Sequence, residues 1–172
     1  MRSFLSRVFS IIGGNDIAIR PDEKAIDRFW HEANAALPDL GADHQVRWIG
    51  LDEETTLEII AYIRSGEKSA TYTVPWINAN YGWPDGSHGL PIILLRFDGL
   101  PALMVETTDV IKINFGDIGS DLSGLDGPPV RDIKVWRNLH TMYWNEILGR
   151  FGRECSPDMP VLVEKFKPVF PL

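Results

Sequence analysis

The sequence has little of what disulfides and metal centres require. It contains one cysteine, Cys155, and four histidines that are scattered without metal-ligand spacing over 172 residues. One thiol excludes an intramolecular disulfide and a zinc site built from thiolates. We therefore expect no metal and no cofactor, and a reducing compartment, the cytoplasm.

Basic residues are also fewer than acidic residues. The chain has 17 lysines and arginines against 24 aspartates and glutamates, which gives a formal net charge of −7. A protein that covers a length of duplex needs a broad basic surface, so we expect no duplex DNA as a partner. A small basic pocket for one nucleotide or a short single strand is compatible with this balance, because the local field depends on where the charges lie.

Long hydrophobic runs are absent as well. The apolar stretch at residues 1–14, MRSFLSRVFSIIGG, is interrupted by Arg7 and is too short to cross a bilayer. No small-residue cleavage site follows it, so we expect no stable membrane insertion. We interpret residues 1–20 as an arm that packs on the domain, frays, or docks to a partner or a second copy; export or membrane contact is the other reading. Residues 21–172 suit one domain.

Apolar residues, at 44%, are numerous enough for a packed core. Periodicity and breaker residues predict helices over 21–37, 53–65 and 131–149, and strands over 46–49, 69–76, 92–97, 102–113 and 161–170. They predict a loop over 78–90, a long loop or a short helix over 115–130, and a bend of the fourth strand near Thr107 and Thr108. Strands that return by hairpins, with helices gathered elsewhere, indicate an α+β fold: a small, mostly antiparallel β-barrel flanked by helices.

A lysine stands at the junction between the second helix and the second strand. Gly66 suits the left-handed position that ends a helix, Lys68 follows, and then Ser69, Thr71 and Thr73 alternate with apolar residues. One interpretation is structural, since a cation near a helix C-terminus stabilises it by about 0.3–1 kcal/mol. In the other, a partly buried Lys68 has a lowered pKa and acts as a base for Thr71 or a water; if it stays charged, it holds a phosphate or an oxyanion.

Three segments resemble one family when they are taken in order. They are AYIRSGEKSATYTVPW at 61–76, with its Gly-x-Lys and small or hydroxyl residues, MVETTDV at 104–110, and SPDMPVLVEKFKPVF at 156–170. Together they resemble the ASCH family, a branch of the PUA-like barrels, over roughly residue 21 to the C-terminus. The resemblance implies a barrel with a cleft lined by the Gly-x-Lys segment.

The resemblance also implies activities: RNA binding, RNA cleavage in some bacterial members, and deacylation of an acetylated cytidine nucleoside in smaller members. Lys68 and Thr71 match the lysine and threonine that act in the deacylating members. The glutamate of those members does not carry over. Its position falls near Pro128, where Asp126 and Asp132 are the nearest carboxylates.

The RNA-cleaving members contribute a second comparison. Tyr62 matches their tyrosine, whereas Asp132 stands where they have a serine. Each activity thus keeps part of its set of residues and loses part. Structural interpretations of these residues stay open too: Tyr62 as a core residue, Asp126 as a turn residue, and Asp132 as the first charge of the third helix.

Aromatic residues beside the Gly-x-Lys segment are candidates for stacking on a base, a contact that contributes roughly 1–3 kcal/mol. Trp76, Tyr81 and Trp83 are those candidates, and we place Trp83 first because its loop also holds Pro84 and Gly86. We assign the other four tryptophans to the core (Trp30, Trp48, Trp136 and Trp144).

Two polar residues of the predicted strands complete the candidate substrate-binding set. Ser69 follows the lysine directly, and Glu106 interrupts an apolar strand. A carboxylate there is costly unless it is paired, so Glu106 either lines the cleft or faces solvent through strand alternation.

These observations lead to one hypothesis and two competitors. The first is an ASCH-type domain that binds single-stranded RNA or a modified nucleoside around Lys68, with hydrolysis (as a ribonuclease or an N-acetylcytidine-type amidohydrolase) left open. The alternative is a non-catalytic protein-interaction module, including a homodimer formed through the N-terminal arm. The third is a hydrolase acting on an unrelated small amide.

Overall fold

A computed structural model describes residues 20–37, 39–50 and 52–171. The arm expected over residues 1–20 therefore lies, apart from Arg20, outside the described residues. The elements follow the order α1 (Glu23–Ala36), β1 (Gln45–Trp48), α2 (Glu53–Arg64), β2 (Ala70–Thr73), α3 (Pro75–Tyr81), β3 (Pro91–Leu95), β4 (Pro101–Asn114), η1 (Phe115–Asp117), α4 (Ser120–Ser123), η2 (Pro128–Val130), α5 (Ile133–Leu148), η3 (Gly149–Phe151) and β5 (Pro160–Phe170).

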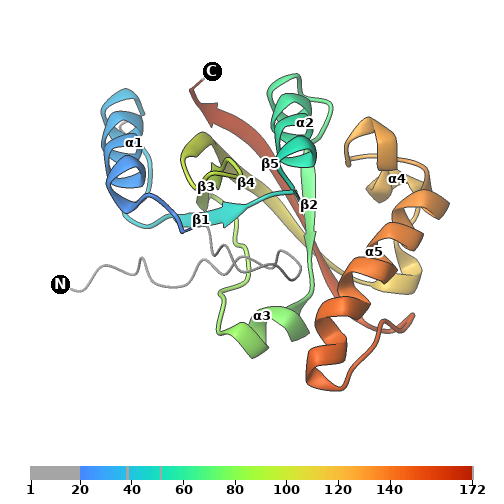
Figure 1. The fold of residues 1–172 in the computed structure, drawn as a ribbon. Coiled ribbons are helices and arrows are strands. Elements are labelled where there is room, and N and C mark those ends of the chain that lie inside the picture. Colours follow the sequence, from blue (N-terminus) through green and yellow to red (C-terminus); the bar gives the residue numbers. More distant parts are fainter. Residues whose placement is uncertain (1–19, 38, 51, 172) are drawn as a thin grey trace.

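The five strands form one curled sheet, an open half-barrel with helices around it (Figure 1). The strand order is β1-β3-β4-β5-β2, so β1 and β2 are the two edges. Only β1 and β3 run parallel, and the other neighbours are antiparallel. This arrangement confirms the predicted α+β class and the mostly antiparallel barrel flanked by helices.

Three apolar clusters attach the helices to the sheet. The first joins α3 and α5 to β2 and β5 around Tyr72, Trp136 and Val163. In the second, Ile60 and Ile63 of α2 pack on β3 and β4. The third packs α1 on the opposite face of β3 and β4, through residues that alternate with those of the second cluster. The barrel core is thus divided among helices. β2 lies between α2 and α3 in the chain, and its buried residues share a cluster with α3 and α5.

The predicted strand over 69–76 and the loop over 78–90 need correction. β2 ends at Thr73, and α3 begins at Pro75. Proline at the first helical position has a preset φ and lacks only an N–H that the first turn leaves unpaired, so it starts a helix here. Gly82, with φ 66°, ends α3 in the left-handed conformation.

Three further details concern β4, α5 and two tryptophans. The register of β4 against β5 shifts between Thr107 and Asp109, which confirms the predicted bend. On α5, Leu139 is 39% exposed, whereas Trp136, Trp144 and Leu148 are buried in the core. Trp30 and Trp48, assigned to the core, are half-buried at its border.

Candidate functional site

Lys68 turns inward at the end of α2. Gly66 has φ 76° and reverses the chain, and the Lys68 backbone N–H donates to the Tyr62 carbonyl over 2.9 Å. The side chain is 6% exposed. Its Nζ forms an ion pair with Asp126 Oδ1. We call Lys68 and Asp126 the lysine pair.

Asp126 is presented by the loop between α4 and η2. The Ser69 and Ala70 backbone N–H groups both donate to the Leu125 carbonyl, at 2.9 and 3.2 Å, so the loop is fixed to the start of β2. Asp126 Oδ1 also accepts from the Gly127 N–H at 2.7 Å. These bonds hold a carboxylate that is only 6% exposed against a lysine that lies 58 residues earlier in the chain.

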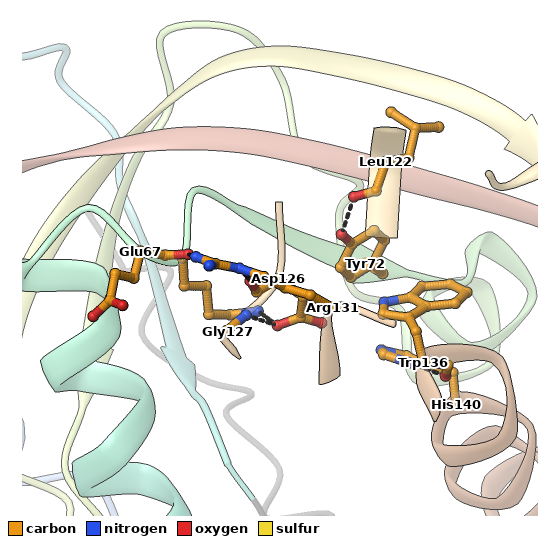
Figure 2. A network of polar contacts seen from close by, with 9 residues as sticks. Glu67, Tyr72, Leu122, Asp126, Gly127, Arg131, Trp136 and His140 are labelled. Carbon is orange, nitrogen blue, oxygen red and sulfur yellow. Dashed lines mark hydrogen bonds and ion pairs between the residues drawn. The ribbon is translucent and has the colours of Figure 1, made fainter. Parts of the chain in front are cut away.

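Arg131 and the aromatic rings surround this loop. Arg131 Nε donates to the Asp126 carbonyl at 3.0 Å, and its Nη2 donates to the Glu67 carbonyl. Figure 2 shows Asp126 and Arg131 between Glu67 and the rings of Tyr72, Trp136 and His140. The lysine pair therefore has the Arg131 guanidinium and an aromatic wall as neighbours.

Burial dominates the electrostatics of this region. It lowers the pKa of Lys68, and the neighbouring Asp126 carboxylate opposes that shift. Burial also lowers the pKa of His140 to about 4. It raises the pKa of Tyr72, whose hydroxyl donates to the Leu122 carbonyl at 2.6 Å. The region thus favours uncharged His140 and Tyr72 and makes the Lys68 proton easier to remove.

Tyr62 lies against the same loop. A Cβ added at Gly127 would be 3.0 Å from Tyr62 Cδ2, so the ring contacts the backbone that carries Asp126. The structure therefore brings together three of the predicted residues, namely Lys68, Asp126 and Tyr62.

Thr71 lies on the opposite face of β2. Ala70 and Tyr72 are buried and belong to the cluster under α5, whereas Thr71 and Thr73 alternate with them and are half-buried. Thr71 is paired in register with Glu164 of β5. Lys68 Nζ lies over the Tyr72 ring, 5.9 Å from its centroid. Alternation therefore places the Thr71 hydroxyl on the face of β2 that points away from Lys68.

A second ion pair occupies the Thr71 face, and sequence analysis missed it. Glu164, 1% exposed, accepts from Arg47 Nη1 of β1 at 2.7 Å and from Thr73 Oγ1 of β2 at 2.7 Å. Arg47, Glu164 and Thr73 thus connect the two sheet edges, and we call them the edge bridge. A Cβ at Gly86 would clash with Glu164 Oε2, so the loop between α3 and β3 covers the carboxylate closely.

Glu164 could have been predicted as a charged residue within an apolar strand. The same argument selected Glu106. Glu106 is placed differently: its side chain is 30% exposed and pairs with Lys167 at 3.2 Å. This is the solvent-facing alternative. Strand pattern alone did not distinguish the two glutamates, because β4 and β5 both contain long buried segments.

The remaining candidates lie away from the lysine pair or make contacts of their own. Asp132 caps α5 by accepting from the N–H groups of Lys134 and Val135 at 2.9 and 3.1 Å. Ser69 contributes backbone bonds to the Leu125 loop. The Arg153 guanidinium lies 4.6 Å from the centroid of the Trp76 ring, and Trp83 stacks on Tyr81 at 4.6 Å.

No cluster of three or more histidine, cysteine, aspartate or glutamate side chains in the described parts of the chain has an arrangement that would hold a metal ion. Within the same residues, no helix has the length and apolar character needed to span a membrane.

Comparison with known proteins shows one matching family and several similar solved structures. A family model described as the ASCH domain matches residues 47–170. Among solved structures, an ASCH domain from Lactobacillus crispatus JV V101 superimposes with a TM-score of 0.77 at 19% identity, covering 85% of this chain and 94% of the other. A protein from Enterococcus faecalis V583 gives 0.75 at 20% identity, with 85% and 88% covered. A search of curated proteins gave no match.

Proposed function

We propose, from the premise that this chain belongs to the ASCH domain family, that it binds single-stranded RNA or a modified nucleoside through the region around the lysine pair. The observation that carries the proposal is the burial of Lys68 beside Asp126 in the Gly-x-Lys segment. Buried titratable groups whose pKa is perturbed by a specific partner concentrate at functional sites. In this proposal a ligand oxygen competes with Asp126 for the Lys68 ammonium.

Binding has more support than hydrolysis by a Lys68–Thr71 couple. A base must reach the hydroxyl that it activates within about 3 Å or through one water. Strand alternation puts Thr71 on the face of Glu164, whereas Lys68 pairs with Asp126 beside Tyr72. If the protein hydrolyses its ligand, Lys68 and Asp126 are the acid–base couple that the geometry offers. The Tyr62 ring lies beside them, against Gly127.

Binding can be tested with short RNAs and cytidine derivatives, including N4-acetylcytidine, by fluorescence anisotropy and calorimetry. We expect Lys68→Met/Asp126→Asn, which removes both charges without leaving one unpaired, to weaken binding about tenfold or more, the loss typical of a hydrogen bond to a charged group. Lys112→Met, at an exposed lysine of β4, is the matched control and should bind like wild type. Equal affinity in wild type and the double variant, or no binding by wild type, would remove the proposal.

An interaction module is the second candidate, and one observation favours it. Val135, Leu139 and Met142 are 47%, 39% and 67% exposed and follow one another at helical spacing along α5. Light scattering on wild type, Leu139→Lys/Met142→Lys and a chain lacking residues 1–14 tests self-association. A dimer that is lost in either variant supports this candidate, and a monomer throughout counts against a self-docking surface.

A further inference from the structure

Arg131 carries a positive charge beside the lysine pair. Other arginines of the chain form ion pairs with carboxylates (Arg47 with Glu164, Arg96 with Asp98, and Arg150 with Glu146). Within residues 20–37, 39–50 and 52–171, Arg131 forms no such pair. Because an arginine keeps its proton in a protein, this charge is permanent and has no fixed counter-charge among those residues.

Two main-chain carbonyls hold the Arg131 guanidinium in place. Its Nε donates to the Asp126 carbonyl at 3.0 Å in half-buried surroundings, and its Nη2 donates to the Glu67 carbonyl in an exposed position. A guanidinium has more N–H donors than these two bonds use, and the side chain is only half-buried. Asp126 belongs to the lysine pair and Glu67 directly precedes Lys68. A ligand that reaches the lysine pair from solvent therefore meets a fixed guanidinium with unused donors.

The carboxylates nearest to Arg131 in this region are engaged elsewhere. The Glu67 carboxylate accepts from a serine hydroxyl at 2.9 Å, and Figure 2 shows it pointing away from Arg131. The Asp132 carboxylate accepts from the first N–H groups of α5. The lysine pair consists of one cation and one anion, so its charges balance. An anion that approaches Arg131 thus finds its remaining donors unoccupied by these groups.

The chemistry of the guanidinium restricts the ligand. Its planar fork of N–H groups matches the oxygens of a phosphate and binds them with two parallel hydrogen bonds. A nucleotide or an RNA strand brings a phosphate to the site, whereas a nucleoside brings none and would leave the Arg131 charge without a partner.

We infer that Arg131 binds a phosphate group of the ligand, so that the site takes a nucleotide or an RNA strand in preference to a free nucleoside. The inference rests on the proposed function for the presence of a nucleotide-type ligand at the lysine pair. It adds the substrate class and the residue that selects it.

The first test compares ligands that differ only by a phosphate, by calorimetry with cytidine and cytidine 5′-monophosphate, and with uridine and uridine 5′-monophosphate. We expect wild type to bind each nucleotide more tightly than its nucleoside. In Arg131→Gln the nucleotide affinity should fall about tenfold or more, as for a hydrogen bond to a charged group, while the nucleoside affinity is retained. An arginine that only fixes the loop would affect both ligands equally. Equal losses, or a wild type that binds both ligands equally well, overturn the inference.

The second test measures the salt dependence of binding to a short single-stranded RNA. In Arg131→Gln, the slope of log K against log salt should become less negative by about 0.7, the value for one phosphate contact with a single strand. Arg131→Lys keeps the charge and should keep the wild-type slope. Arg137→Gln is the matched control, because Arg137 lies on α5 and also donates to main-chain carbonyls, those of Phe115 and Ile118, at 2.8 Å; it should keep the slope too.

The outcomes separate this inference from the proposed function. A slope that changes as much in Arg131→Lys or Arg137→Gln as in Arg131→Gln overturns the inference, because charge beside the lysine pair would then not be the cause. RNA binding that is weakened in Lys68→Met/Asp126→Asn but has the wild-type slope in Arg131→Gln overturns this inference alone. No binding of any nucleoside, nucleotide or RNA by wild type overturns the proposed function with it.

Discussion

Two ion pairs flank β2, and they differ in what they can do. The edge bridge joins an arginine to Glu164 and connects strands β1 and β2, which do not hydrogen-bond to each other. The lysine pair joins the start of β2 to a nearby loop, and both partners are nearly inaccessible. Arginine keeps its proton in proteins, whereas a buried lysine can release it. The edge bridge is therefore suited to holding the two edges of the half-barrel together. The lysine pair is suited to proton transfer or ligand exchange.

Removing the charge of Glu164 should lower the stability of the protein more than any other substitution considered below. Glu164→Gln leaves Arg47 without a counter-charge, although the 22% exposure of the Arg47 side chain softens the loss. We expect unfolding to become easier by about 3–4 kcal/mol, near the lower end for a broken buried pair. Urea denaturation measures it. Glu106→Gln, at an exposed pair, is the control and should cost less than about 1 kcal/mol; similar losses in the two variants would show that the edge bridge has no special role.

The lysine pair should respond more to one substitution than to two. Lys68→Met leaves Asp126 buried and unpaired, and we expect a loss of about 3 kcal/mol in the free energy of unfolding. Lys68→Met/Asp126→Asn should recover most of it, because no buried charge remains. A double-mutant cycle by urea denaturation measures the coupling. Additive losses would mean that the two side chains do not act as a pair.

Acidification should affect the lysine-pair side of β2 through His140. Its pKa is about 4 in the folded protein against an ordinary value of 6.5, so the unfolded chain binds the extra proton between these values. Stability therefore falls as the pH drops from 6.5 toward 4, by about 1–3 kcal/mol for this group. Thermal denaturation between pH 7 and 5 should show a shallower slope in His140→Gln. An unchanged slope would contradict a buried neutral histidine.

The hydroxyl of Thr73 should have the smallest effect. Thr73→Val keeps the shape and removes the donor to Glu164 Oε1, while Arg47 still pairs with the other oxygen. We expect a loss of about 1–2 kcal/mol by urea denaturation. Thr71→Val is the control, because Thr71 lies two residues before Thr73 on the same face of β2. Equal effects would show that the Thr73 bond contributes nothing to closing the sheet.

Much of the fold followed from local pattern. Helix α2 was predicted within one residue because its apolar periodicity ends at Gly66, and β5 because its alternation is long. The boundary at Pro75 was missed because strand alternation continues across it to Trp76. Periodicity reports the buried face, and it did not show that the chain changes from strand to helix there.

The polar pairs were harder to predict, because they depend on tertiary contacts. Asp126 and Asp132 were equivalent candidates in the sequence, and only the fold of the loop shows that Asp126 reaches Lys68 while Asp132 caps α5. Arg47 and Glu164 are 117 residues apart and meet only because the sheet curls. No local spacing encodes such a contact.

The central claim concerns the Lys68 amine. It is tested by the pH titration of the Lys68 side-chain Cε resonance, assigned with Lys68→Met, in the presence and absence of single-stranded RNA. We predict a pKa below that of an unperturbed lysine, and a change in the titration when RNA is added. An ordinary lysine titration that RNA leaves unaltered would contradict the assignment of this amine as the ligand-binding group.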